Sequence, residues 1–352
     1  MKKIRVLIVE DSLVVRELLK HIIGSDPRFE IVAAVESAEE AIRLLDSTRP
    51  DVISLDIRLP GMNGLDATLH IMQQRPTPIV VVAANVDDDE LNITMNALRA
   101  GALSVVEKPV GVTNVAFEAM AAKLCTQLVI MSQVKVVRQG GNRGLSFGTV
   151  AEPQPAPKAA GRGGYSMVGL VASTGGPQAL VQLLSGLDGF RLPILLVQHI
   201  TASFLDGFVS WLSGVTPFKV KIAEMGEVPR PGHVYLAPAD RHLAVHHGQV
   251  LITDAPTQYS QRPSGSVLFA SMAKDFGPRG IGVLLTGMGV DGSDGLKAMR
   301  DAGAYTIAEH ESTCVVYGMP GAAAKLGAPR EMLPLPGIAT RLRQLTLEEG
   351  EP

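Results

Sequence analysis

The chain has 352 residues, of which 46% are hydrophobic and 19% are charged, and its formal net charge is -3 at pH 7. This is the composition of an ordinary globular protein, and at about 100 to 200 residues per domain the length predicts two domains. No long basic run is present, which argues against a nucleic-acid partner because duplex-binding surfaces carry clustered Lys and Arg.

Residues 1–124 alternate short apolar runs with segments in which apolar residues recur every three to four positions. The short runs predict strands, and the periodic segments, such as residues 39–45, predict helices. Strands that alternate with helices indicate a parallel sheet wound on both faces. The predicted strands cover residues 4–9, 30–35, 51–56, 79–83 and 103–107.

Charged residues follow three of these strands. Glu10 and Asp11 come after the first strand, Asp56 ends the third, and Lys108 follows the fifth. Because the carboxyl ends of parallel strands meet at one edge of a sheet, we expect the four side chains to lie together. The alternative is that acidic residues simply end strands at the surface, and four residues of suitable type in the proper order weaken it.

Phosphoryl transfer to a carboxylate requires a nucleophilic oxygen, a cation that neutralises crowded negative charge, and a positive group for the phosphoryl oxygens. Asp56 is the predicted nucleophile. Glu10 and Asp11 are the predicted Mg²⁺ ligands, since Mg²⁺ favours carboxylates completed by water and phosphate oxygens. Lys108 is the predicted contact to the phosphoryl group. The first domain is therefore expected to be a switch.

Three segments surround this cluster: Val9-Glu10-Asp11-Ser12, residues 55–64 and Glu107-Lys108-Pro109. With them, residues 1–124 resemble a response-regulator receiver domain. The resemblance implies a flavodoxin-like fold with a five-stranded parallel sheet and phosphotransfer from a partner histidine kinase. It also implies that Mg²⁺ is held by Glu10, Asp11, Asp56 and the backbone carbonyl of Arg58.

Two positions depart from the receiver pattern. Ala83 stands where the family usually has Ser or Thr, whose hydroxyl bonds the phosphoryl group, and Val105 stands where the family often has an aromatic residue. The residues that would bind the phosphoryl group are all present. The two residues that usually transmit phosphorylation to the rest of the domain are replaced, which weakens this relay. We therefore expect that phosphorylation occurs and is coupled to the output less strongly or by another route.

Residues 125–164 are predicted to be a linker. From about residue 139 the chain is rich in Gly, Pro and Ala, with few residues able to form a core. Residues 134–138 are predicted to form a short strand or a docking segment within it.

Residues 165–347 are predicted to form a second doubly wound α/β domain. Its sheet is expected to be mixed, with a hairpin over residues 243–252 that turns near Gly248 at one edge of the sheet. The other predicted strands cover residues 167–172, 193–197, 219–223, 233–236, 282–286 and 304–308.

Cys125 and Cys314 are too few and too far apart to indicate a disulfide framework or a zinc site. The apolar run behind Met1-Lys2-Lys3 is only about six residues long and lacks a cleavage-type segment, unlike a signal peptide. No stretch approaches the ~20 apolar residues that span a bilayer. We expect a cytoplasmic protein with reduced thiols and no membrane insertion.

A possible nucleophile, Ser173, lies in residues 171–177, between a predicted strand and a predicted helix. A serine on such a turn can project its hydroxyl from the sheet edge near a helix N-terminus. Phosphate binding is the competing interpretation, although neither a Gly-Lys-Ser/Thr ending nor a full Gly-x-Gly-x-x-Gly fingerprint is present.

A reactive serine needs a base and a group that orients the base. His199 follows the next apolar run, and Asp291 lies in a loop after a later strand, so both are expected at the same edge as Ser173. A structural histidine and a helix-capping aspartate are the alternatives, and Asp294 competes for the role of Asp291. The order Ser, His, Asp differs from that of α/β-hydrolases, which disfavours an ordinary lipase.

Behind a receiver domain, these segments resemble the catalytic domain of the chemotaxis protein-glutamate methylesterase family, CheB, along residues 165–347. Further matching segments are Val197-Gln198-His199, residues 234–243, Arg262-Pro263-Ser264, residues 285–289 and residues 314–320. Small departures occur at residues 200–202 and at Val290, and they bear on substrate preference more than on chemistry.

By this resemblance Ser173 is the nucleophile, His199 the general base, Asp291 its orienting partner and the backbone N–H of Met288 an oxyanion donor, while Thr174 assists in positioning the histidine. The implied reaction is hydrolysis of glutamate γ-methyl esters on chemoreceptors with release of methanol. Deamidation of receptor glutamines is an implied side activity. The esterase reaction is expected to need no cofactor, and the unmodified receiver is expected to cover the active site.

The main rival function is a phosphorylation-controlled module that binds receptors without catalysis; the complete Ser173, His199 and Asp291 set argues against it. A receiver that drives a transcription factor is a second rival. It would require a basic helix-turn-helix, and none is found after residue 125.

Overall fold

The computed structural model of the protein describes residues 2–83, 88–109, 114–134, 136 and 164–347. The chain divides into two compact units, Met1–Ser146 and Phe147–Pro352. Most of the segment predicted to be a linker, and most of the predicted short strand at 134–138, lie outside the described residues.

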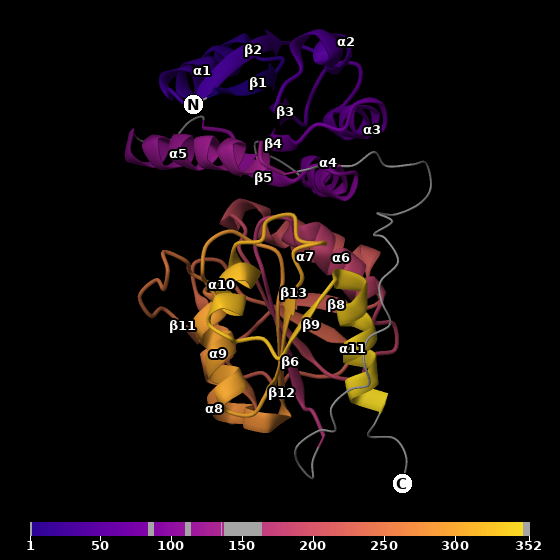
Figure 1. Ribbon diagram of the computed structural model, residues 1–352, viewed down its shortest axis with the longest axis vertical. Helices are drawn as coiled ribbons and strands as arrows, with labels where there is room; N and C mark the ends of the chain where they lie inside the picture. Colours follow the sequence, from indigo (N-terminus) through magenta and orange to yellow (C-terminus); the bar gives the residue numbers. More distant parts are fainter. Residues whose placement is uncertain (1, 84–87, 110–113, 135, 137–163, 348–352) are drawn as a thin grey trace. The chain divides into compact units, whose positions relative to one another are not determined.

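The first unit contains the predicted parallel sheet of five strands in the order β2-β1-β3-β4-β5. Helices α1 and α5 contact each other, as do α2, α3 and α4 in succession, so the sheet is wound on both faces (Figure 1). The elements are β1(Ile4–Val9), α1(Leu13–Ser25), β2(Phe29–Val35), α2(Ala38–Thr48), β3(Val52–Asp56), α3(Gly64–Gln74), β4(Ile79–Ala83), α4(Asp88–Arg99), β5(Ser104–Glu107) and α5(Asn114–Met131).

Local sequence explains where these helices begin. Ser12, Ser37 and Asn63 stand at the N-caps of α1, α2 and α3, and the side chain of each accepts a backbone N–H of the first turn. Gly64, the first residue of α3, lies so close to β3 that an added Cβ would be 2.7 Å from the carbonyl oxygen of Asp56. A glycine there lets α3 start directly behind Asp56.

The second unit contains a sheet of seven strands in the order β14-β13-β12-β6-β7-β9-β8. One group of contacting helices comprises α6, α7 and α11, and another comprises α8, α9 and α10. The elements are β6(Met167–Ala172), α6(Gly176–Ser185), β7(Ile194–Gln198), α7(Ala202–Val215), β8(Lys219–Ile222), β9(His233–Leu236), β10(His242–His246), β11(Gln249–Thr253), α8(Gly265–Phe276), η1(Gly277–Arg279), β12(Gly280–Leu284), α9(Ser293–Asp301), β13(Tyr305–Glu309), α10(Met319–Lys325), β14(Glu331–Leu333) and α11(Leu335–Leu347).

Two expectations about this sheet were wrong. All of its paired strands are parallel, so the sheet is not mixed. The hairpin β10–β11 forms with its turn at His247 and Gly248, but as a separate two-stranded sheet and not at the edge of the large one. The physical reason is its apolar face: Leu243 and Val245 are buried in the cluster that contains Leu268 of α8, so the hairpin covers a helix.

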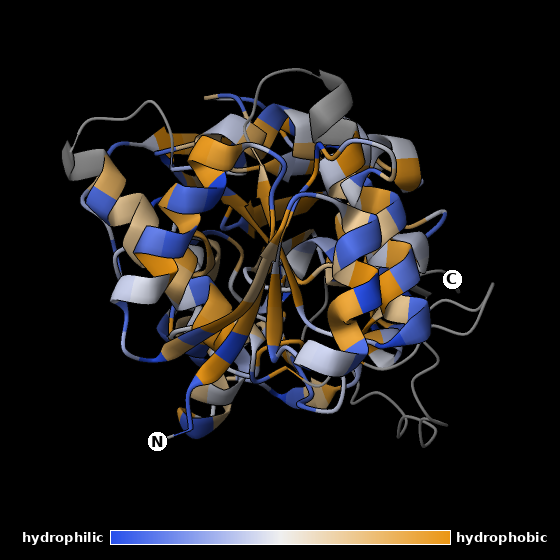
Figure 2. Cartoon of the chain, turned by 90° about the horizontal axis from the view of Figure 1, so that it is seen from above, coloured by the Kyte–Doolittle hydropathy of each residue, from blue (hydrophilic) through white to orange (hydrophobic). Residues whose placement is uncertain are grey.

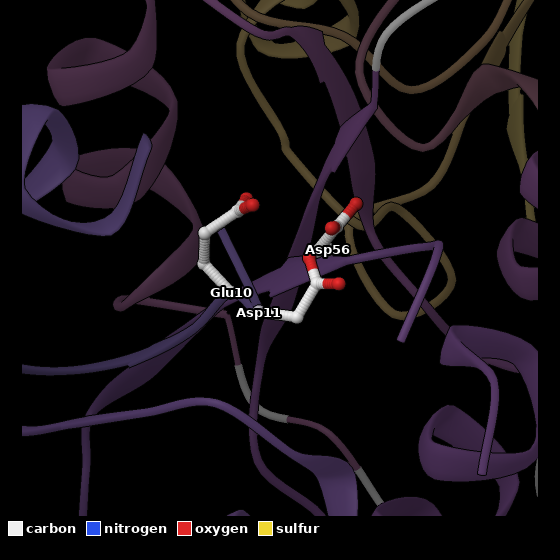
Figure 3. A group of neighbouring side chains, drawn as sticks. All are labelled: Glu10, Asp11 and Asp56. Atoms are coloured by element: carbon white, nitrogen blue, oxygen red, sulfur yellow. The ribbon is translucent and has the colours of Figure 1, made fainter. Parts of the chain in front are cut away.

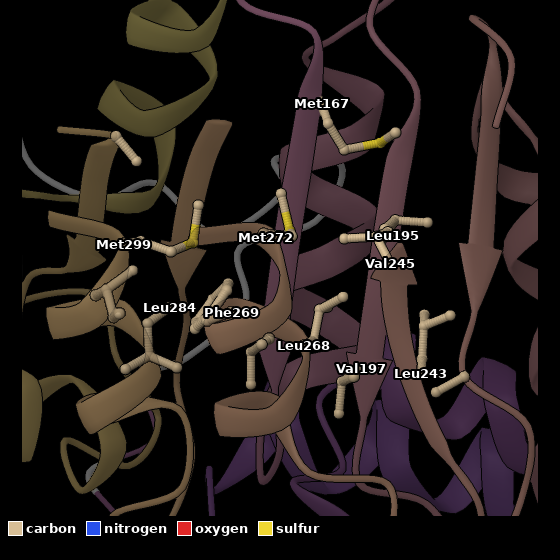
Figure 4. Close-up of a cluster of buried hydrophobic side chains, with 14 of the residues drawn as sticks. Met167, Leu195, Val197, Leu243, Val245, Leu268, Phe269, Met272, Leu284 and Met299 are labelled. Atoms are coloured by element: carbon tan, nitrogen blue, oxygen red, sulfur yellow. The ribbon is translucent and has the colours of Figure 1, made fainter. Parts of the chain in front are cut away.

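The core of the second unit lies between its sheet and the helices that cover it. Figure 4 shows part of this cluster, with Phe269 of α8 beside Leu284 of β12. Burial of such side chains stabilises a domain by roughly 1.5 to 3 kcal/mol each. In the hydropathy colouring of Figure 2, central strands are mostly hydrophobic, whereas flanking helices show alternating hydrophobic and hydrophilic bands. Among the described helices, none combines the length and the apolar character needed to cross a bilayer.

Candidate active site

The structure brings the predicted acidic cluster together at the carboxyl edge of the first sheet. Glu10, Asp11 and Asp56 each offer a carboxylate oxygen, and these oxygens lie within 4.8 Å of one another. Figure 3 shows the three side chains at the ends of β1 and β3. Glu10 and Asp56 are buried, whereas Asp11 is exposed, so the cluster is open to solvent on one side.

Lys108 binds the two buried carboxylates. Its Nζ lies 2.8 Å from Asp56 Oδ2 and 3.0 Å from Glu10 Oε2. Burial and the charge of Asp56 raise the pKa of Glu10 to about 7, against the opposing effect of Lys108. Burial also raises the pKa of Asp56. Burial alone would lower the pKa of Lys108, but its two carboxylate partners outweigh that effect and the pKa is raised.

This donor set fits a divalent cation. Three carboxylates share one lysine charge, which leaves an excess of negative charge at oxygen donors of the kind that Mg²⁺ binds. The backbone N–H of Arg58 donates to Asp56 Oδ1 at 3.2 Å, which places the Arg58 backbone beside the cluster. Ala83 is fully buried at the end of β4, and its carbonyl accepts the N–H of Lys108 at 2.9 Å.

Ser173 lies at the point where the second sheet reverses its strand order. It follows β6, whose neighbours in the sheet are β7 on one side and β12 on the other. The chain runs from β6 outward through β7 and later returns to build β12 on the opposite side. Ligand sites of open α/β sheets lie in the crevice at such a reversal, outside the carboxyl ends of the strands.

His199 and Asp291 meet at this edge. His199 follows β7, and its Nε2 lies 2.9 Å from Asp291 Oδ2. Because Nε2 of the neutral ring donates to Asp291, Nδ1 is the nitrogen that can take a proton from Ser173. Within the described ranges, the Ser173 hydroxyl makes no hydrogen bond to this ring, a separation common in enzymes without bound substrate.

Asp291 is held by more than the histidine. Ser264 Oγ donates to Oδ1 at 2.6 Å, and the Gly265 N–H donates to Oδ2 at 2.7 Å, both from the start of α8. Burial alone would raise the pKa of Asp291, but the hydrogen bonds from His199, Ser264 and Gly265 together lower it. Asp291 is therefore a carboxylate with a fixed orientation.

Asp294, the competing carboxylate, has other partners. Its Oδ2 accepts hydrogen bonds from the Tyr259 hydroxyl at 2.8 Å and from Gln258 at 3.2 Å, and its Oδ1 is bonded by Ser266. The structure thus pairs His199 with Asp291 and gives Asp294 a separate role in holding the 258–261 loop.

The loop after β12 brings Met288 next to the serine. Gly287 packs directly against Ser173, since an added Cβ on Gly287 would be 2.8 Å from Ser173 Cβ. The Ser173 N–H donates to the Thr286 carbonyl at 3.0 Å, and Thr286 Oγ1 donates to the Thr174 carbonyl at 2.9 Å. In the described part of the chain, the N–H of Met288 has no acceptor, so it is available to an oxygen in the crevice.

Sequence reasoning gave no role to Gln198. Its Nε2 donates to the carbonyl oxygens of Ser173 at 2.9 Å and of His199 at 3.0 Å, so one amide group joins the two backbones. Gly176 makes room for this group, because an added Cβ would be 2.1 Å from Gln198 Oε1. The only signal in the sequence was the position of a polar residue at the end of an apolar run.

Glu309 is a second polar residue at a strand end to which sequence reasoning assigned no role. It ends β13 and is completely buried. Its Oε2 accepts the N–H of Thr286 at 2.8 Å, so this carboxyl supports the loop that leads to Met288. Burial raises the pKa of Glu309 to about 6 in spite of that hydrogen bond.

Two family models match the chain. Residues 6–117 match the response regulator receiver domain, and residues 168–342 match the CheB methylesterase. A protein-glutamate methylesterase/protein-glutamine glutaminase of Paramagnetospirillum magneticum is 71% identical and covers 98% of both chains. A protein of Nitrosospira multiformis with the same printed name is 43% identical, over 99% of this chain and 98% of that protein.

Proposed function

The chain belongs to the CheB methylesterase family, and we propose that it is a phosphorylation-regulated serine esterase. Its proposed substrates are glutamate γ-methyl esters on chemoreceptors, and glutamine side chains are proposed as a second substrate. The proposed domains are a receiver at 1–124, a linker at 125–164 and a catalytic domain at 165–347. We also propose a cytoplasmic location.

The observation that carries this proposal is the His199–Asp291 pair at the edge where Ser173 lies. A buried carboxylate that is fixed by Ser264 and Gly265 holds Nε2 of the ring, which leaves Nδ1 to act as a base. A module that only bound receptors would have no need of such a pair.

In the proposed acylation, Ser173 Oγ attacks the γ-carbonyl carbon of the ester and its proton passes to His199 Nδ1. The Met288 N–H stabilises the negative oxygen of the tetrahedral intermediate. The intermediate collapses, the carbon–oxygen bond to the methoxy group breaks, and the proton on His199 leaves with it as methanol. Thr174, next to Ser173, is proposed to help position the histidine.

In the proposed deacylation, water attacks the glutamyl ester on Ser173 while His199 takes a proton from it. Collapse returns that proton to Ser173 and releases the glutamate as a carboxylic acid, which ionises to the carboxylate by losing its proton to solvent. A glutamine side chain follows the same path and releases ammonia, because the leaving nitrogen also takes its proton from His199.

The proposed phosphoryl acceptor is Asp56, with a histidine kinase as the donor. Glu10, Asp11, Asp56 and the carbonyl of Arg58 would hold Mg²⁺, which would neutralise charge on the incoming phosphoryl group. Lys108, which is 2.8 Å from Asp56 Oδ2, is placed to contact a phosphoryl oxygen.

The test of this function is methanol release from methylated receptor membranes. The wild-type protein should release methanol, and Ser173→Ala should release none above the rate without enzyme. Equal release by both proteins would remove Ser173 as the nucleophile.

The phosphoryl acceptor is tested separately. Asp56→Asn should still release methanol, but treatment with a small phosphodonor should no longer increase the rate.

A further inference from the structure

A cleft of about 860 Å³ opens beside the proposed catalytic centre. One wall is the loop that carries Gly289 and Val290, and the other is α10 with the residues at both of its ends. Among the described residues that line the cleft, Lys325 is the only charged one. The cleft is therefore mainly apolar.

The loop that lines this cleft also carries the proposed oxyanion donor, Met288. Gly289 follows Met288 directly, and Val290 precedes Asp291. On the opposite wall, Gly318 donates its N–H to the carbonyl of Gly287 at 3.0 Å. The two walls thus meet at the residue that packs against Ser173.

Large apolar side chains are exposed around the cleft. The exposed fractions are 46% for Tyr259, 44% for Val290 and 39% for Tyr317, and Met288 beside them is 46% exposed. Exposed apolar residues that gather in one place on a protein surface mark an interaction site more often than single ones do.

Both tyrosines are held in fixed positions. Tyr259 and Ser260 have φ angles of 53° and 59°, which non-glycine residues rarely adopt, and the Tyr259 hydroxyl donates to Asp294 Oδ2 at 2.8 Å. The Tyr317 ring packs on Gly321, where an added Cβ would be 3.1 Å from the ring. A strained backbone that fixes an exposed ring is typical of a functional site.

Small residues line the cleft beside the tyrosines. Gly318, Gly321 and Ala322 are among them. Small residues leave space for an apolar side chain of a partner, while the two rings provide apolar walls on which it can pack.

We propose that this cleft binds an apolar side chain of the substrate polypeptide, from a residue near the esterified glutamate. The proposal rests on the proposed function, because a glutamate that is part of a protein has polypeptide on both sides. A chain that places its ester at Ser173 and Met288 must continue across the adjacent surface. The loop that carries Met288 also lines the apolar cleft, so Tyr259 and Tyr317 would determine which glutamates are selected.

The experiment compares two short synthetic peptides with a central glutamate γ-methyl ester, one with leucine and one with aspartate at the flanking positions. Methanol release by the full-length protein gives kcat/KM for each. The wild type should prefer the leucine peptide by about tenfold, the effect of burying one apolar side chain. Ala322→Phe places an aromatic ring inside the cleft, which narrows it, and should reduce this preference to about twofold or less.

Met225→Phe is the matched control. Met225 is 58% exposed and is not among the residues that line the cleft, so this variant adds aromatic bulk elsewhere and should keep the preference. Labelling of Ser173 by a small fluorophosphonate shows whether the catalytic centre of Ala322→Phe has folded. If it is labelled but keeps the wild-type preference, the proposal is wrong.

Two other outcomes would also overturn it. Equal use of the two peptides by the wild type would show that the cleft selects no apolar neighbour. A rise in the activity of unphosphorylated Ala322→Phe toward both peptides would show that the cleft binds another part of this chain. Ser173→Ala separates this proposal from the function on which it rests, since failure of that variant to abolish release would refute the esterase itself.

Discussion

The hydroxyl of Ser264 donates a 2.6 Å hydrogen bond to Oδ1 of Asp291, so the residue that caps α8 also holds the partner of His199. Ser264 caps the helix by accepting the N–H of Val267. One side chain therefore links the start of a helix to the proposed catalytic carboxylate.

Loss of this hydroxyl should reduce activity more than stability. Ser264→Ala removes a hydrogen bond to a charged group, typically about 1.5 to 3 kcal/mol, and should lower kcat/KM for methanol release at least about tenfold. Ser264→Thr keeps a hydroxyl and should retain most of the activity. An inactive threonine variant with unchanged thermal unfolding would contradict this role.

Gln198 should affect turnover through the backbones that it joins. Gln198→Leu removes the donor shared by the carbonyls of Ser173 and His199, and we expect kcat to fall roughly tenfold with little change in KM. Steady-state kinetics on a methyl-ester peptide would measure both constants. A change confined to KM would argue against the positioning role.

Gly176 provides an independent test of the same contact. Gly176→Ala should be more damaging in the wild type than in a Gln198→Ala background, because the added Cβ would be 2.1 Å from Gln198 Oε1. A double-mutant cycle on kcat measures this coupling. Strictly additive effects would show that the two residues do not interact in solution.

Glu309 should make the catalytic domain less stable as the pH rises. Burial raises its pKa from 4.5 to about 6, so the folded state holds the proton more tightly than the unfolded state does. The stabilisation is complete below pH ~4.5 and is lost as the pH rises through ~6, a change of about 2 kcal/mol.

Glu309→Gln should remove that dependence, since an amide oxygen still accepts the N–H of Thr286 but does not ionise. We expect the variant to be more stable than the wild type at pH 7 by about 2 kcal/mol, with the difference disappearing near pH 4.5. Urea unfolding followed by the fluorescence of Trp211, the single tryptophan, would measure it. A constant difference between pH 4.5 and 7 would rule out this titration.

Ala83 should limit the response to phosphorylation. It is buried at the end of β4 and has no hydroxyl that could form a hydrogen bond to a phosphoryl group on Asp56. We expect Ala83→Thr to increase, several-fold, the activation of methanol release by a small phosphodonor. An identical activation factor in the two proteins would disprove the idea of a weakened relay.

Much of this architecture could be predicted because parallel strands that are buried on both faces consist of continuous apolar runs in the sequence. The runs that became β1, β3, β6 and β7 end immediately before or at the charged and polar residues of the two sites. Strand ends converge in a parallel sheet, so Glu10, Asp56, Ser173 and His199 could be placed from the sequence.

Other features depend on contacts that the pattern does not encode. Strand β14 has only three residues, Glu331–Leu333, and too short a run to be recognised. The hairpin was placed at the sheet edge because alternation shows which face is apolar but not what covers it. Ser264 and Gln198 find partners about 25 residues away, which only the folded chain brings near.

The central claim is that Ser173 becomes covalently acylated. Rapid quenching of the enzyme with a methyl-ester peptide, followed by digestion and mass spectrometry, tests it most directly. The account predicts that the fragment containing Ser173 gains the mass of the peptide less methanol, and that the gain disappears in Ser173→Ala. An adduct on another residue that persists in Ser173→Ala would contradict it.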